Sequence, residues 1–271
     1  HCTQQLKMSP EEHLAHIKQT IDYALSKNFT VNLYLEDWSS GMRDSRDYLF
    51  MMMDELVKLP IKRFLLPDTL GILNPLQCVE YMRQMVRRYP NSHFDFHAHN
   101  DYDLAVSNSL AAVLSGAKGL HVTVNGLGER CGNAPLASVQ VILKDMFGAK
   151  TNIKEDRLND ISRLVEGYSG IAVAPNTPVV GDNVFTQVAG VHADGDNKDK
   201  LYCNDLVPER FGRHREYALG KNSGKANIIQ NLNELGLELT PEQTKAVTKR
   251  ITELGDRKEL VTQDDLPYIV S

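Results

Sequence analysis

The sequence lacks the features that mark membrane-spanning, disulfide-stabilised and nucleic-acid-binding proteins. None of its apolar runs approaches the ~18 residues that a bilayer-spanning helix needs. Its four cysteines are scattered and form no CxxC pair, which is typical of reduced thiols rather than of a disulfide framework or a zinc finger. Acidic residues outnumber basic ones by 35 to 30, whereas nucleic-acid binding requires a basic surface that displaces phosphate counterions. We therefore expect a cytoplasmic protein that binds neither a membrane nor nucleic acid.

What the first part of the chain does contain is an alternation of strand and helix signals. Apolar and β-branched runs predict strands over residues 30–35, 61–66, 93–96 and 120–124. Capping sequences and helical periodicity predict helices over residues 10–26, 45–58, 75–89, 102–115 and 135–146. Nearly continuous apolar strands joined by helices are typical of a parallel sheet.

Polar residues follow every one of these predicted strands. They are Glu36-Asp37, Asp68-Thr69, His97 with His99, and residues 125–133. An open doubly wound sheet would gather such residues at one switch point, whereas a barrel places them at the carboxyl end of each strand. A complete barrel has eight strands in about 250 residues, so four strands make half of one. The predicted fold class is α/β: residues 1–150 form the C-terminal half of a TIM (β/α)8 barrel, and residues 151–271 a mostly helical accessory region.

Two motifs at the predicted strand ends suggest a metal site. In His97-Ala98-His99 the two histidines are at positions i and i+2 of a strand, so their imidazoles share a face and can hold one divalent metal. The glycine-rich segment 125–133 has one residue too many for a dinucleotide fingerprint. We interpret it as a loop that lets backbone approach a ligand, with Asn133 as a further oxygen donor. The competing interpretations are structural histidines and an ordinary turn before a helix.

Two further features have weaker signals. Glu36 closes the first strand, where a carboxylate serves as a general base or is simply a solvated loop acid. The segment 220–225 is similar to a phosphate loop but is one residue short and follows no clear strand, so we prefer a structural interpretation.

Taken together, the motifs at residues 97–101, 125–133 and 190–195 closely resemble those of the 2-isopropylmalate, homocitrate and citramalate synthases. The resemblance runs over essentially the whole chain. It implies a metal-dependent TIM-barrel enzyme that condenses acetyl-CoA with a 2-oxo acid in branched-chain amino-acid biosynthesis. The segment Tyr34-Leu35-Glu36-Asp37-Trp38 is most similar to the citramalate synthases, which take pyruvate.

The resemblance also implies a role for individual residues. His97 and His99 match the metal-binding histidines, and Asn133 matches a position that completes the surroundings of the metal. Zinc, manganese and magnesium are all compatible with such a mixed nitrogen and oxygen site. Tyr34 and Thr69 match positions that contact the 2-oxo acid.

Three residues are implied to carry the catalysis. Glu36 matches a catalytic acid, and His192 and Tyr202 match accessory-region residues that usually reach the active site of a partner subunit. Either Glu36 or His192 would be the base that removes a methyl proton from acetyl-CoA, with Tyr202 assisting. A homodimer is expected for the same reason.

The sequence departs from the family pattern in two respects. Asp103 stands where the family commonly has glycine, which puts the first turn of the following helix in question. The Arg-Asp pair of the family's first strand is also absent, so the chain alone is expected to be inactive. The missing strands would lie upstream in a longer parent or come from a second half-barrel.

Three other hypotheses remain open from the sequence. One is a 2-isopropylmalate synthase that uses 2-oxoisovalerate in leucine biosynthesis. Another is an acyl-CoA lyase or aldolase of the same barrel type, and the third is a non-catalytic metal-binding remnant.

Overall fold

The computed structural model describes residues 1–187, 203–221, 223–259 and 261–270. The chain divides into two compact units, His1–Lys150 and Thr151–Ser271. Each unit has its own buried core, and we describe them separately.

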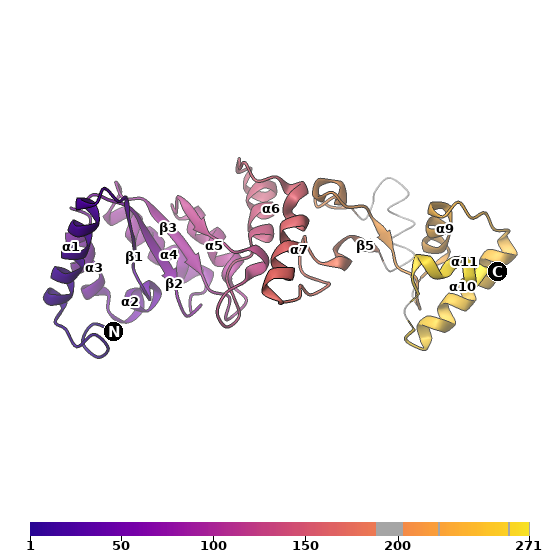
Figure 1. Ribbon diagram of the computed structural model, residues 1–271, viewed down its shortest axis with the longest axis horizontal. Helices are drawn as coiled ribbons and strands as arrows, with labels where there is room; N and C mark the ends of the chain where they lie inside the picture. Colours follow the sequence, from indigo (N-terminus) through magenta and orange to yellow (C-terminus); the bar gives the residue numbers. More distant parts are fainter. Residues whose placement is uncertain (188–202, 222, 260, 271) are drawn as a thin grey trace. The chain divides into compact units, whose positions relative to one another are not determined.

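The first unit is built on one four-stranded parallel sheet in the order β1-β2-β3-β4 (Figure 1). Its strands are β1 (Val31–Tyr34), β2 (Ile61–Asp68), β3 (Phe94–Ala98) and β4 (Gly119–His121). Its helices are α1 (Pro10–Ser26), α2 (Trp38–Asp44), α3 (Arg46–Leu56), α4 (Pro75–Arg88), α5 (Ala105–Leu114), the 3-10 turn η1 (Val124–Gly126) and α6 (Leu136–Phe147). The predicted α/β fold with parallel strands is confirmed.

Local sequence signals account for where several helices begin. α1 starts with a complete capping box, in which the Ser9 side chain accepts from the Glu12 amide and the Glu12 side chain accepts from the Ser9 amide. α4 has the same arrangement between Asn74 and Gln77. Proline occupies the first turn of both helices, where its missing N–H costs no hydrogen bond.

The core lies between the helices and one face of the sheet. Phe64 and Leu66 of β2 and Phe96 of β3 are at most 2% exposed and belong to one apolar cluster with helix residues. Trp38 of α2 packs edge-on against Phe96, with ring centroids 6.3 Å apart. Successive strand residues point to opposite faces, so this face is apolar while the other one is free to carry polar side chains.

The opposite face of the sheet carries a buried carboxylate. Asp95 of β3 is 2% exposed, and its oxygens lie 2.8 Å from His93 Nε2 and 3.2 Å from Arg63 Nη1. Gly119 is its register partner on β4. A Cβ atom at Gly119 would lie 2.3 Å from Asp95 Oδ1, so any side chain there would have to displace this ion-paired group.

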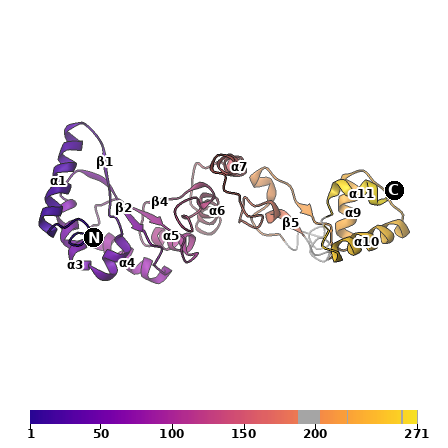
Figure 2. The same ribbon diagram turned by 60° about the horizontal axis from the view of Figure 1, so that its bottom comes forward.

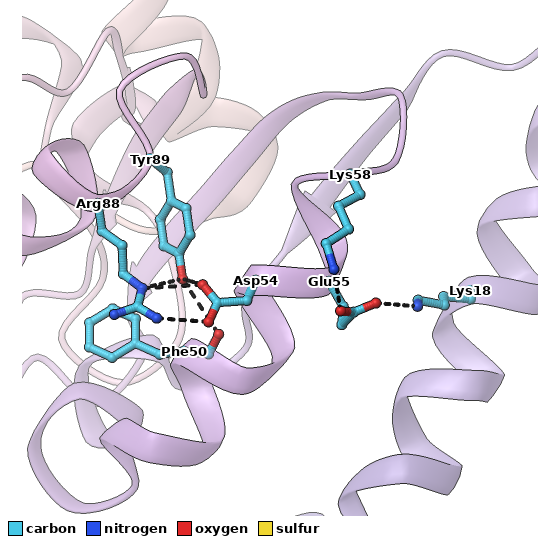
Figure 3. Close-up of polar contacts among 7 residues, drawn as sticks. All are labelled: Lys18, Phe50, Asp54, Glu55, Lys58, Arg88 and Tyr89. Atoms are coloured by element: carbon cyan, nitrogen blue, oxygen red, sulfur yellow. Dashed lines mark hydrogen bonds and ion pairs between the residues drawn. The ribbon is translucent and has the colours of Figure 1, made fainter.

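Charged side chains also join the helices of the outer layer. Figure 3 shows Arg88 of α4 binding Asp54 of α3 through two hydrogen bonds of 2.7 and 3.2 Å, with the Tyr89 hydroxyl donating to the same carboxylate. The guanidinium also lies over the Phe50 ring, 4.7 Å from its centroid. Exposed pairs of this kind contribute roughly 0–1 kcal/mol each, so they orient the helices more than they stabilise the fold.

The helix predicted over residues 45–58 is confirmed as α3, which runs from Arg46 to Leu56. α2, which begins at Trp38 in front of it, was not predicted, and Ser45 with φ −142° separates the two helices. β4 is shorter than the predicted 120–124, because Asn125 with φ +58° turns the chain into η1. The predicted helix start at Tyr102 is also too early: α5 begins at Ala105, after Asp103 adopts a left-handed φ of +57°.

The second unit is mainly helical. Its elements are η2 (Glu155–Arg157), α7 (Leu158–Ser169), η3 (Asp182–Phe185), β5 (Thr186–Gln187), η4 (Pro208–Phe211), β6 (Glu216–Tyr217), α9 (Lys225–Glu234), α10 (Pro241–Asp256), η5 (Gln263–Asp265) and α11 (Leu266–Val270) (Figure 2). β5 and β6 form a small parallel pair that was not predicted. Ile228, Leu232, Ile251 and Leu266 are central to its apolar cluster. No helix in the described part of the chain is both long and apolar enough to span a bilayer.

We predict that Gly119→Ala destabilises the full chain by about 1–3 kcal/mol, because the added methyl group displaces Asp95 from its ion pairs. Urea unfolding measures the change. Gly167→Ala is the matched control: this site in α7 has open space around it, and alanine favours a helix over glycine, so stability should rise slightly. Equal effects of the two substitutions would contradict the steric argument.

Candidate functional site

The parallel register brings the carboxyl ends of all four strands to one edge of the sheet. Tyr34 ends β1, and Thr69 directly follows β2. His97 lies near the end of β3, and His121 is its register partner on β4. Residues far apart in the sequence therefore meet at this edge, as in barrel enzymes whose sites are built from the loops that follow the strands.

Three histidines and a tyrosine cluster there. The ring centroid of His97 lies 5.1 Å from that of His99 and 5.8 Å from that of His121. The Tyr34 ring is 5.9 Å from His97 and 6.0 Å from His121. Burial, and then the neighbouring His99 and His121, lower the pKa of His97 to about 4, so its imidazole is neutral at neutral pH. Neutral imidazole is the form that ligates metals.

The predicted metal residues fit a cation in part. Nδ1 of His97, Nδ1 of His99 and Oδ1 of Asn133 are all buried and have no hydrogen-bond partner among the described residues. His99 and Asn133 are also neighbours through an antiparallel bridge. Buried polar atoms without partners are costly, and a divalent cation would satisfy nitrogen and oxygen lone pairs of this kind. The described residues contain no cluster of three His, Cys, Asp or Glu side chains that could hold a metal, so further ligands would come from elsewhere.

Asn133 is held by a tightly packed loop. Its Nδ2 donates to the Leu127 carbonyl at 3.2 Å. A Cβ at Gly128 would lie 2.0 Å from that same Nδ2, and a Cβ at Gly132, which has φ +83°, would lie 2.0 Å from the Gly126 carbonyl oxygen. The glycines are therefore required by close packing of the loop on itself around Asn133.

The structure brings Glu36 and Thr69 together. The Thr69 hydroxyl donates to Glu36 Oε1 at 3.0 Å and accepts from the Asp37 amide at 3.1 Å. Asp37 has a left-handed φ of +55° and immediately precedes α2. Thr69 therefore orients the Glu36 carboxylate at the edge of the sheet. Tyr34 lies close by, and burial together with the Glu36 charge raises the pKa of its phenol to about 12, which keeps it protonated.

Two of the predicted catalytic residues, His192 and Tyr202, lie outside the described residues. Their roles stay predictions.

Sequence reasoning gave no role to several other residues of this edge. Asp68 is fully buried, and its two oxygens accept from the amides of Ile72 and Leu73, which closes the turn after β2; burial raises its pKa. His121 was not singled out either. In the predicted strand 120–124, residues 121 and 123 are at positions i and i+2 and share a face, which could have drawn attention to His121. Arg130, whose side chain binds Asp101, gave no local signal because the two are 29 positions apart.

A parallel α/β sheet with histidines, a carboxylate and a glycine-rich loop at its carboxyl-terminal edge defines the class of TIM-barrel-type proteins with a site at the strand ends. The family comparison agrees with this class. The model of the HMGL-like family matches residues 1–165, and the chain belongs to this family. A second model, homocitrate synthase post-HMGL domain-like, matches residues 179–259. The resemblance drawn from the sequence motifs is confirmed at this level.

Two relatives from one organism are about equally similar to the chain. The 2-isopropylmalate synthase of Methanocaldococcus jannaschii is 37% identical over 100% of this chain and 52% of its own length. The (R)-citramalate synthase of the same organism is 34% identical over 100% of this chain and 54% of its own length. The chain thus spans about half the length of these relatives.

A solved structure shares the fold. The HMG-CoA lyase of Bacillus subtilis superposes with a TM-score of 0.57 at 23% identity, covering 66% of this chain and 62% of that one. This likeness shows a barrel-type architecture.

We predict that His97 titrates near pH 4 in the metal-free chain. Because its pKa lies below the ordinary 6.5, the unfolded chain binds more protons between these values. The contribution of His97 to stability is therefore complete above about pH 6.5 and is lost as pH falls through about 4. NMR titration of ring-labelled histidine measures the pKa, and His97→Gln assigns the resonance. A measured pKa near 6.5 would contradict the conclusion that burial lowers the pKa of His97.

Proposed function

We propose that this chain is part of an acyltransferase that condenses acetyl-CoA with a 2-oxo acid, with pyruvate preferred and citramalate as product. The observation that carries the proposal is the set of unpartnered donor atoms of His97, His99 and Asn133 at the carboxyl edge of the sheet. Its support from relatives is a match along the whole chain to enzymes named citramalate synthase and 2-isopropylmalate synthase.

His97, His99 and Asn133 would hold the divalent metal, whether zinc, manganese or magnesium. When bound, such an ion acts as a Lewis acid that makes the ketone of a 2-oxo acid more electrophilic and fixes its orientation. The lowered pKa of His97 keeps its ring available as a ligand throughout the neutral range.

The other residues of the edge would handle the proton and the substrate. The methyl group of acetyl-CoA is weakly acidic and requires a positioned base. Glu36, oriented by the Thr69 hydroxyl, is one candidate for this base, and His192 assisted by Tyr202 is the other. Tyr34 is a bulky wall beside His97 and leaves less room for a branched 2-oxo acid, which favours pyruvate.

The two compact units suggest that each has a different role in the enzyme. We propose that residues 1–150 belong to the catalytic barrel and that residues 151–271 are accessory. In a homodimer this accessory part would reach the site of the partner subunit, and the enzyme would work in the cytoplasm. The alternative substrate, 2-oxoisovalerate, is favoured by the likeness to a 2-isopropylmalate synthase.

We predict that the intact protein turns over pyruvate faster than 2-oxoisovalerate, because the Tyr34 ring takes up space beside His97. Release of CoA from acetyl-CoA with each acid in parallel measures the preference. When this chain alone is given isotope-labelled acetyl-CoA and pyruvate, it should form no more labelled citramalate than a blank without protein. A clear preference for 2-oxoisovalerate would refute the pyruvate proposal, and cleavage of hydroxymethylglutaryl-CoA without condensation would favour a lyase.

We also predict that removing one imidazole weakens metal binding. His97→Ala and His99→Ala should each lower the affinity of the chain for Mn²⁺ or Zn²⁺ by at least about tenfold, measured by calorimetry, because each removes a direct ligand. His16→Ala, on the exposed surface of α1, is the matched control and should bind as the unmodified chain does. Equal binding by all three variants would place the metal elsewhere.

A further inference from the structure

One guanidinium connects three of the loops that follow the strands. Arg130 lies in the glycine-rich loop after β4. Its Nε donates to Asp101 Oδ1 at 2.7 Å and its Nη2 to Asp101 Oδ2 at 2.9 Å, so it binds the carboxylate of the loop after β3 through both oxygens. The same Nη2 donates to the Thr69 carbonyl at 2.7 Å, in the loop after β2.

These contacts continue to the residues of the candidate site. Thr69, whose carbonyl binds Arg130, donates its hydroxyl to Glu36 in the loop after β1. On the other side, Asn133 follows Arg130 by three positions in a loop fixed by glycine contacts and bridged to His99. Arg130 is therefore linked to a candidate base in one direction and to candidate metal ligands in the other.

The surroundings of Asp101 leave little freedom for a different arrangement. A Cβ at Gly71, which has φ +61°, would lie 2.9 Å from Asp101 Oδ2 and 3.0 Å from its amide nitrogen. The loops after β2 and β3 are thus in direct contact beneath the guanidinium. Arg130 itself has φ +54°, a left-handed conformation that is uncommon for a residue other than glycine.

The ion pair is too exposed to be a general stabiliser. The Arg130 side chain is 38% exposed and that of Asp101 21% exposed. Arg88 and Asp54 make the same two-pronged pair between α4 and α3, with exposures of 48% and 46% (Figure 3). What distinguishes Arg130 is that its third hydrogen bond joins loops that carry site residues.

We infer that Arg130 is a positioning residue. By joining the loops after β2, β3 and β4, it keeps Asn133 and Glu36 in their places beside His97 and His99. Its planar fork satisfies a carboxylate and a carbonyl at once, which a lysine ammonium on a flexible stem does not reproduce. The placement of the loops stands on the structure alone, whereas its consequence for catalysis rests on the proposed function.

The first experiment measures loop order in the full chain without any substrate. Hydrogen exchange of residues 125–134 should rise about tenfold in Arg130→Gln and in Asp101→Asn, because the loop opens locally without global unfolding. Arg88→Gln is the matched control and should leave this segment unchanged. Unchanged exchange at 125–134 in both loop variants, or an equal rise in Arg88→Gln, would overturn the inference.

The second experiment tests the consequence for the site. Arg130→Gln should lower Mn²⁺ affinity about 10-fold to 100-fold, as is usual when a partner that orients a ligand is lost, and Arg130→Lys should not restore it. In the intact enzyme kcat should fall while KM for acetyl-CoA stays the same. Unchanged Mn²⁺ affinity and kcat would overturn the positioning role. Faster loop exchange with weaker Mn²⁺ binding, in a protein that condenses no 2-oxo acid, would support the inference and refute the proposed function.

Discussion

Parallel hydrogen bonding between β1, β2, β3 and β4 is the constraint on which the candidate site depends. Because all four strands point the same way, every loop that follows a strand emerges at one edge of the sheet. Site residues as far apart in the sequence as Tyr34 and Asn133 therefore lie at this same edge. The helices that join the strands supply the apolar face on which this arrangement rests. Trp38 connects the site to the core, because it begins the helix that follows Glu36 and its ring packs on Phe96.

The two faces of the sheet have different chemistry. The helix-covered face is held by aromatic and aliphatic packing, while the other carries charges, with Asp95 paired to Arg63 and His93. This polar lining leads along the strands to the imidazoles at the edge. His121 lies 3.7 Å from Asp95 through its Nε2 and 5.8 Å from His97 between ring centroids, so the buried carboxylate and the histidine cluster are parts of one continuous polar surface.

Signals confined to a few neighbouring residues could be predicted from the sequence. The helix starts at Ser9 and Asn74, the presence of the four strands and the proximity of His97 and His99 all follow from local spacing. Features set by distant packing could not. The Asp101–Arg130 pair joins residues 29 positions apart and forms only once β3 and β4 are side by side. The joining of Glu36 to Thr69 likewise depends on the pairing of β1 with β2.

The contact between Gly119 and Asp95 has a consequence for how this sequence can diverge. The missing side chain on β4 leaves the space that the carboxylate on β3 occupies. A larger residue at position 119 requires the Asp95 carboxylate to move from its present place or a shorter side chain at position 95. Any side chain introduced at position 119 therefore also disturbs the ion pairs that Asp95 makes with Arg63 and His93.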